Sequence, residues 1–231
     1  MKVAIHQPNY LPYLGFFHKA SLSDVFVILD SVQFVKSGPL AWANRNKIRT
    51  KEGWIWLSVP VLTKGRFPVT IKDALVDNTG NWRKKHWYSI SCNYNKAKHF
   101  KRYAAFFEQL YRSPWDKLAG LNQKIINYLF EQLEIGAKTV KASELKSRGA
   151  GTRLLINICK ELGADSYIYG QHGEDYMDKE SFCREKIGLL AQNFKHPRYQ
   201  QLHEPFIEGL SVIDLLFNRG AESARIIKCK A

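Results

Sequence analysis

The sequence lacks three features, and each absence excludes a class of protein. No apolar run approaches the roughly 20 residues that a helix needs to cross a bilayer. The apolar start, Val3 to Ile5, is too short for a signal peptide. The four cysteines form no CxxC pair and have no His partners at metal-ligand spacing. We therefore expect a cytoplasmic protein with free thiols, no metal site and no bound cofactor.

Acidic residues are also scarce. The 231 residues include 35 Lys and Arg against 21 Asp and Glu, which gives a formal net charge of +14. This excess is more than solubility requires, so we expect an anionic partner such as a nucleotide, a sugar phosphate or a nucleic acid. No Asp-x-Asp pair is present, which argues against a metal-dependent glycosyltransferase.

The first nineteen residues carry the clearest local pattern. A short apolar strand at 2–5 leads into a loop with prolines at positions 8 and 12, which forbid a helix there. Gly15 permits a turn, a short helix is predicted at 16–22, and a second apolar strand is predicted at 25–29. This order is the first half of a parallel α/β unit, and such sheets bind ligands beyond the carboxyl ends of their strands. The polar side chains expected at that edge are His6, Gln7, Tyr10 and Asp30, although a Pro-rich loop of this kind is also compatible with a purely structural role.

The remaining pattern alternates between strands and helices. Apolar or alternating stretches predict strands at 54–62, 69–75, 138–142 and 166–169, and helical periodicity dominates residues 82–133. We predict an α/β fold with a mostly parallel, Rossmann-like sheet and a helical insertion or subdomain. The expected organisation is an amino-terminal α/β half at 1–80, a helical segment at 81–135, and a carboxyl-terminal α/β half at 136–231 packed as one unit with the first.

Two further stretches contain candidate binding groups. Asn44, Arg45, Asn46 and Lys47 supply amide and cationic donors suited to a phosphate or carboxylate, with a solvated basic loop as the alternative. Gly170-Gln171-His172-Gly173 follows the strand predicted at 166–169, with Tyr176 close behind. A single GxxG is weak evidence, but this one is expected at the same sheet edge.

Several of these stretches together resemble the WbqC-like family of bacterial proteins. They are HQPNYLPYLGFFHK at 6–19, DVFVILDSVQF at 24–34, NRNKI at 44–48, WLSVPV at 56–61, the helix, strand and GxxG run at 153–176, HPRYQQ at 196–201 and SVIDLLFNRG at 211–220. The resemblance implies a role in surface-polysaccharide or O-antigen biosynthesis. The opening is also similar, more distantly, to HxGH nucleotidyltransferases, but Phe16 follows Gly15 where the second histidine would stand.

Two hypotheses of function follow, an enzyme from the resemblance and a binding protein from the net charge and the basic, aromatic stretch 82–112. The enzyme is a transferase that acylates or aminoacylates the amine of a nucleotide-linked amino sugar, with an aminoacyl-tRNA or another anionic donor. Its expected catalytic residues are His6 and Asp30, because amide formation needs a base. Its expected substrate-binding residues are Gln7, Tyr10, Gln33, Asn44, Arg45, Asn46, Lys47, Gly170, Gly173 and Tyr176. The alternative is a basic nucleic-acid-binding or scaffold protein without catalysis, since Lys and Arg alternate with aromatic residues over 82–112.

Overall fold

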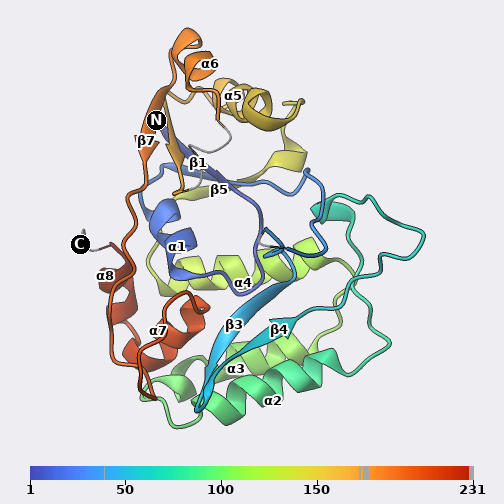
Figure 1. Ribbon diagram of the computed structural model, residues 1–231, viewed down its shortest axis with the longest axis vertical. Helices are drawn as coiled ribbons and strands as arrows, with labels where there is room; N and C mark the ends of the chain where they lie inside the picture. The colour runs from blue at the N-terminus through green and yellow to red at the C-terminus, as the bar shows by residue number, and fades with distance from the viewer. Residues whose placement is uncertain (39, 172, 174–176, 229–231) are drawn as a thin grey trace.

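The computed structural model describes residues 1–38, 40–171, 173 and 177–228, and its centre is a parallel sheet (Figure 1). The strands lie in the order β5-β2-β1-β6-β7, and each neighbouring pair is parallel. Their bounds are β1 Lys2–His6, β2 Val25–Ile28, β5 Lys138–Lys141, β6 Ser166–Tyr169 and β7 Gly188–Ala191. This arrangement confirms the predicted α/β fold with a mostly parallel, Rossmann-like sheet.

Both faces of the sheet are covered, because alternate residues of a strand point to opposite sides. Val3 and Ile5 of β1 pack with helices α5 (Gly151–Glu161) and α6 (Lys179–Arg184). Ala4 packs on the other side, with helices α1 (Leu14–Ser21) and α4 (Leu118–Gln132). A strand buried on both sides needs a continuous apolar run, and Val25–Ile28 provides one.

The strand order reverses direction next to β1. The connection from β1 to β2 passes through α1 on one face, and the connection from β5 to β6 passes through α5 on the other. The topological switch point, where open α/β sheets bind ligands, therefore lies between β1 and β6. β1 pairs with β2 as far as His6, but with β6 only as far as Ala4. The pairing of the two central strands therefore ends at Ala4, two residues before the end of β1.

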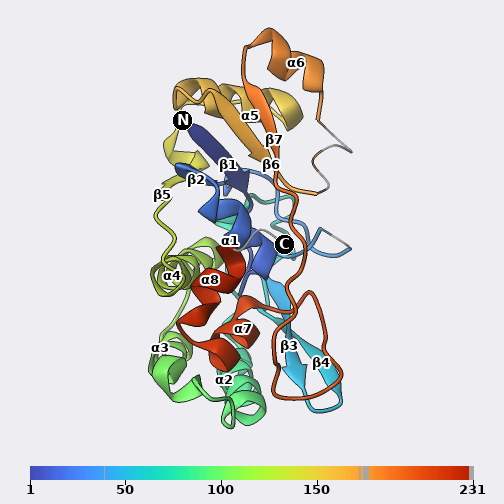
Figure 2. The same ribbon diagram turned by 90° about the vertical axis from the view of Figure 1, so that its left-hand side faces the viewer.

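The carboxyl ends of the strands point toward a second part of the molecule, built from a hairpin and helices (Figures 1 and 2). The strands of the hairpin are antiparallel, and β3 packs on α2 and α7. The bounds are β3 Arg45–Thr50, β4 Gly53–Ser58, α2 Trp82–Tyr94, α3 Phe100–Arg112, α7 Val212–Arg219 and α8 Glu222–Lys228. In the described part of the chain, no helix combines the length and apolarity required to cross a membrane.

The hairpin differs from its sequence pattern. The polar stretch 44–49 carries no strand signal, yet it forms most of β3. The strand predicted at 54–62 was expected to be buried, but it ends at Ser58 and Trp54 and Trp56 of β4 are 43% and 37% exposed. A two-stranded sheet has only one face covered by the rest of the protein, so the side chains on its other face remain exposed to solvent. The strand predicted at 69–75 was wrong, because this stretch contains a 3-10 helix, η1, at Ile71–Asp73.

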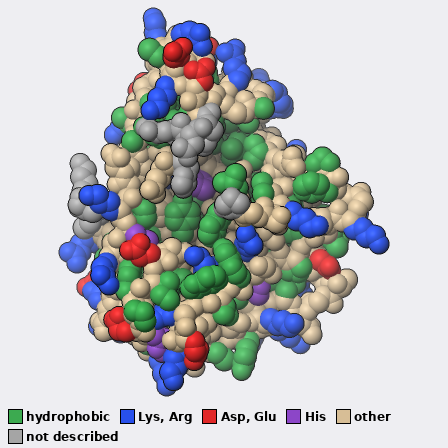
Figure 3. Space-filling model, viewed as in Figure 1, with side chains coloured by type: hydrophobic (Ala, Val, Ile, Leu, Met, Phe, Trp, Pro, Cys, Tyr) green, Lys and Arg blue, Asp and Glu red, His purple; other side chains and the backbone are tan. Residues whose placement is uncertain are grey.

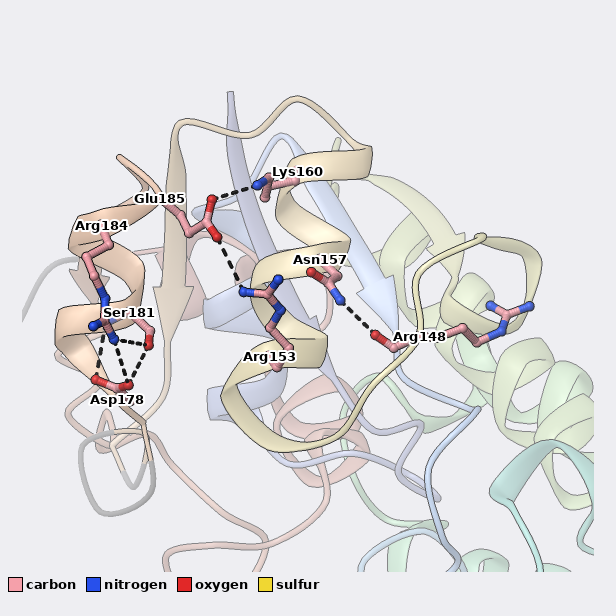
Figure 4. Close-up of polar contacts among 8 residues, drawn as sticks. All are labelled: Arg148, Arg153, Asn157, Lys160, Asp178, Ser181, Arg184 and Glu185. Carbon is pink, nitrogen blue, oxygen red and sulfur yellow. Dashed lines mark hydrogen bonds and ion pairs between the residues drawn. The ribbon is translucent and has the colours of Figure 1, made fainter.

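Polar contacts fix α5 and α6 on their face of the sheet. The carboxylate of Glu185, just after α6, accepts hydrogen bonds from Arg153 at 3.4 Å and from Lys160 at 2.6 Å (Figure 4). Asp178 precedes α6 and accepts a hydrogen bond from the backbone N–H of Ser181, which is a typical N-cap. These groups are largely exposed, so they orient the helices more than they stabilise them.

Candidate functional site

His6 ends β1 at the point where β1 and β6 diverge. Its Nδ1 lies 2.9 Å from the carbonyl oxygen of Gln7. Because a carbonyl only accepts, Nδ1 carries the proton and Nε2 keeps its lone pair. Burial, followed by the charge of Lys19, lowers the pKa of His6 to about 3, although the Gln7 hydrogen bond acts the other way. The imidazole is therefore neutral at physiological pH.

Lys19 is a buried cation beside the carboxyl end of β1. Its Nζ donates a 2.8 Å hydrogen bond to the carbonyl of Ile5, the first residue of β1 beyond the pairing with β6. The same nitrogen lies 5.7 Å from the ring centroid of Tyr167 on β6. No carboxylate forms an ion pair with Lys19 among the described residues. Burial lowers the pKa of Lys19 to about 7, so a large fraction of the molecules carries a neutral amine at neutral pH.

A continuous run of rings extends from His6 to the hairpin. The ring centroids are 6.5 Å apart for His6 and Tyr13, 6.4 Å for Tyr13 and Trp42, and 5.6 Å for Trp42 and Trp56. Trp54 continues the run at 5.7 Å from Trp56. We call Tyr13, Trp42, Trp54 and Trp56 the aromatic surface. Figure 3 shows hydrophobic side chains gathered on this face of the molecule, with Lys, Arg and His side chains among them.

Two cations lie on the aromatic surface. The guanidinium carbon of Arg45 is 4.6 Å from the ring centroid of Trp56, and Nζ of Lys47 is 4.9 Å from that of Trp54. Arg45 also donates to two backbone carbonyls of the 38–41 loop, which fixes the guanidinium in place. Lys47 forms no ion pair with the described residues, so its ammonium is available to an anion. Rings and free cations side by side suit a ligand with a planar base and phosphates.

Asn44 and Asn46 support this surface from inside. Asn46 is fully buried and donates a 2.6 Å hydrogen bond to the carbonyl of Leu11. Leu11 has a φ of +44°, which a leucine rarely adopts, and this bond holds the loop in that conformation. Asn44 donates to the carbonyl of Val59 at 2.9 Å. The Nδ2 groups of both residues are thus occupied in shaping the loop and the hairpin, while Oδ1 of Asn44 is buried without a partner in the described structure.

Asp30 lies at the same sheet edge but faces away from His6. Its two carboxylate oxygens accept hydrogen bonds from the backbone N–H and the hydroxyl of Ser143, at 2.9 and 2.7 Å. Ser143 follows β5, so Asp30 is turned toward the β2 and β5 side of the edge. No hydrogen bond joins Asp30 to His6 within the described residues. The two expected catalytic residues therefore have different hydrogen-bond partners, Gln7 for His6 and Ser143 for Asp30.

The other expected binding residues are dispersed. Tyr10 is fully buried, and its hydroxyl contacts Nδ1 of His86 at 2.8 Å and the hydroxyl of Tyr111, so it belongs to the core. Gln33 is exposed and pairs through its backbone with Thr70. Gly170 and Gly173 follow β6 at the switch point, and Tyr176 lies outside the described residues.

Lys19, Tyr13, Trp42 and Trp56 were not predicted as site residues. A signal for Lys19 was present, because it follows Phe16 by three residues and therefore lies near the apolar face of α1. Trp54 and Trp56 alternate with period two, which places both on one face of a strand. His18, the histidine nearest to the HxGH pattern, is buried beside Gln192, with Nδ1 3.2 Å from the amide nitrogen.

The described residues hold no cluster of metal ligands, and one of their cysteines is buried. No three His, Cys, Asp or Glu side chains in that part of the chain lie close enough to hold a metal ion. Cys159 is buried, and burial raises the pKa of its thiol to about 12, so it packs as an apolar group.

Comparisons with known proteins place the chain in a family. The family model described as the WbqC-like protein family matches residues 7–226. A protein of Mycobacterium tuberculosis (strain ATCC 25618 / H37Rv), named "Uncharacterized protein Rv1507c", is 34% identical over 224 residues, which cover 96% of this chain and 95% of that protein. No solved structure matches significantly. The chain therefore belongs to the WbqC-like protein family.

Proposed function

We propose that the chain is a transferase of surface-polysaccharide biosynthesis that acylates or aminoacylates the amine of a nucleotide-activated amino sugar. The observation that carries this proposal is the run of rings from His6 to the hairpin, with Arg45 and Lys47 on it. It places an unprotonated imidazole nitrogen at the sheet edge, beside a surface that suits a nucleotide diphosphate.

The aromatic surface would bind the nucleotide. The planar base would stack on Trp42 or Trp56, and the diphosphate would contact Lys47 and the free edge of the Arg45 guanidinium. The amino sugar would then extend toward the β1 end, where Tyr13 lies between the hairpin and His6. In this arrangement the hairpin provides affinity and the switch point provides the chemistry.

His6 would move the proton of the amine. Nε2 accepts that proton while the amine nitrogen attacks the carbonyl carbon of an acyl ester or thioester, and an N–C bond forms. The C–O or C–S bond to the donor then breaks, and the leaving oxygen or sulfur takes the proton from His6. The amide of Gln7, which follows His6 in the chain, would donate to the developing oxyanion. Asp30 has no role in this step, because its carboxylate is bound to Ser143.

A mass-spectrometric assay tests the proposal. Purified protein is incubated with a panel of nucleoside-diphosphate amino sugars and with aminoacyl-tRNA or acyl thioesters as donors. We expect an N-acylated product, which His6→Gln reduces by about 100-fold or more. The control is His203→Gln, a partly exposed histidine outside the site. Absence of product with every pair, or equal activity of His6→Gln and His203→Gln, refutes the proposal.

One observation favours the alternative of a nucleic-acid-binding protein. A hollow of about 490 Å³ between α3 and α7 is lined by several basic side chains, among them Lys96, Lys98, Arg102 and Arg219. A binding protein would show affinity for RNA that falls steeply with salt, and no affinity for sugar nucleotides. The transferase requires binding of the sugar nucleotide, which Lys47→Gln should weaken.

A further inference from the structure

A second cavity opens at the same sheet edge, on the side away from His6. It has a volume of about 680 Å³, within the range of small-molecule sites. It lies beyond the ends of β2 and β5, where Ile28, Asp30 and Lys141 contribute to its wall, and η1 and α4 close it. The proposed reaction at His6 makes no use of it.

The charge of this cavity is positive. Its charged lining consists of Lys72, Lys117, Lys124, Lys141, Asp30 and Asp73, a surplus of two positive charges. Of these lysines, Lys141 is paired at 2.9 Å with Glu144, which lies outside the lining. Both oxygens of Asp30 are occupied by Ser143. Lys72 and Lys117 share Asp73 at 4.0 and 3.9 Å, which is the outer limit of an ion pair. Lys124 forms no ion pair within the described part of the chain.

An aromatic wall and an open floor accompany these lysines. The indole N–H of Trp115 donates a 2.8 Å hydrogen bond to the carbonyl of Leu110, which fixes the ring at the cavity. Gly120, in the first turn of α4, also lines the cavity, and a Cβ added there would meet no atom within 4 Å. The cavity thus offers a flat apolar surface, several ammonium groups and free space.

We propose that this cavity is a second anion site, which binds the phosphates of a nucleoside di- or triphosphate with the base against Trp115. Lysine ammonium groups bind phosphate as point charges, and a di- or triphosphate carries enough negative charge to neutralise the surplus. Asp30, fixed by Ser143, lies at the inner end and limits how deep a phosphate can enter. The inference is independent of the reaction proposed at His6, because a different compartment carries it.

Gly120 allows a direct test. Gly120→Glu places a carboxylate in the cavity from a helical position with room for it, and replacing a helical glycine favours the helix. Gly136→Glu is the matched control, because Gly136 follows the far end of α4, is exposed, and also leaves open space for a Cβ. Both variants change the net charge equally.

Isothermal titration with inorganic pyrophosphate and with ADP measures the effect at fixed salt. We expect wild type and Gly136→Glu to bind both probes equally, Gly120→Glu to bind at least tenfold more weakly, and Lys124→Gln several-fold more weakly. Trp115→Leu should weaken the binding of ADP more than the binding of pyrophosphate, and this difference distinguishes the contribution of the base from that of the phosphates. Circular dichroism checks that each variant is folded.

Three results would overturn the inference. They are absence of binding to wild type at millimolar probe, equal affinity of Gly120→Glu and Gly136→Glu, and loss of binding in Lys47→Gln but not in Gly120→Glu. The last result would assign the anion to the aromatic surface, and so it leaves the proposed function standing while it removes the second site.

Discussion

Replacement of Lys19 by methionine should stabilise the protein at low pH. Lys19 is 4% exposed, forms one hydrogen bond, to Ile5, and has no acidic partner in the described structure. Its ammonium loses the stabilisation of its hydration shell on folding, and the carbonyl of Ile5 and the ring of Tyr167 replace only part of that stabilisation. Methionine has a similar length and no charge, so it fills the same space without this cost.

The size and sign of the effect follow from the pKa of Lys19. A change from 10.5 to about 7 corresponds to roughly 5 kcal/mol against the charged form in the folded state. Below pH 7, Lys19 is charged in both states and the whole cost is present. Between pH 7 and about 10.5 the unfolded chain binds more protons, so stability rises with pH by up to about 1.4 kcal/mol per pH unit.

The Lys19→Met variant avoids the desolvation cost of the charged amine. It also leaves the carbonyl of Ile5 unpaired, which costs about 1–3 kcal/mol. We therefore expect Lys19→Met to be more stable than wild type by about 2–4 kcal/mol at pH 6. Because wild type gains stability as the pH rises, the advantage should vanish and then reverse toward pH 9–10.

Urea unfolding at pH 6, 7, 8 and 9 measures both the difference and its slope. Lys84→Met is the control, because Lys84 is exposed on α2 and its replacement should change little at any pH. A Lys19→Met variant that is less stable than wild type at pH 6, with a difference independent of pH, would refute the reasoning. That result would mean that Lys19 is well solvated or paired in the folded protein.

Three further predictions concern other parts of the fold. Asp214 is buried and accepts hydrogen bonds from two tyrosines and from Gln201, and burial raises its pKa to about 6. We expect Asp214→Asn to lower the free energy of unfolding at pH 7 by about 1–3 kcal/mol, because the new amide lacks matching partners. The variant should also abolish the loss of stability that Asp214 causes as the pH rises from about 4 to 6, and urea unfolding measures both effects. Gly220 has a φ of +58°, and a Cβ there would lie 2.6 Å from Nδ1 of His99, so Gly220→Ala should lower the melting temperature in calorimetry by several degrees. Glu185→Gln removes exposed ion pairs only, and its urea midpoint should correspond to a change of less than about 1 kcal/mol.

Four strands of the central sheet could be predicted because the residues that identify each strand are adjacent in the sequence. Residues 2–5, 25–29, 138–142 and 166–169 each lie within one residue of an observed strand. The strand β7 at Gly188–Ala191 had no such signal, because it is a short edge strand with mostly exposed residues. The central strands β1, β2 and β6 could be predicted from burial on both faces, and the edge strand β5 from the alternation of its residues.

The hairpin could not be predicted because its partners are distant in sequence. The guanidinium of Arg49 is buried and donates to the carbonyls of His203 and Pro205, more than 150 residues away. Asn46 likewise depends on Leu11. A polar stretch of this kind reads as a solvated loop until the carbonyl groups that satisfy it are known.

The division of the sheet edge also depends on more than strand order. His6 and Asp30 follow neighbouring strands, which justified the expectation that they meet. Asp30, however, lies two residues beyond Ile28, the register partner of His6, and its carboxylate is drawn toward β5 by Ser143. The edge is thus divided into an aromatic part with the buried Lys19 at β1 and β6 and a cationic cavity at β2 and β5.

The end of β1 determines the surroundings of His6. Because β6 leaves β1 after Ala4, the carbonyl of Ile5 would lack a partner, and Lys19 supplies one. Burial, followed by the charge of Lys19, keeps the pKa of His6 low and its Nε2 unprotonated. In the proposed reaction that nitrogen accepts a proton from an amine, while the lysines beside β5 and Lys47 on the hairpin would attract anions. The segment from His6 to Lys19, which carries the most specific part of the family resemblance, would therefore supply both the proposed base and a cation that acts on its pKa.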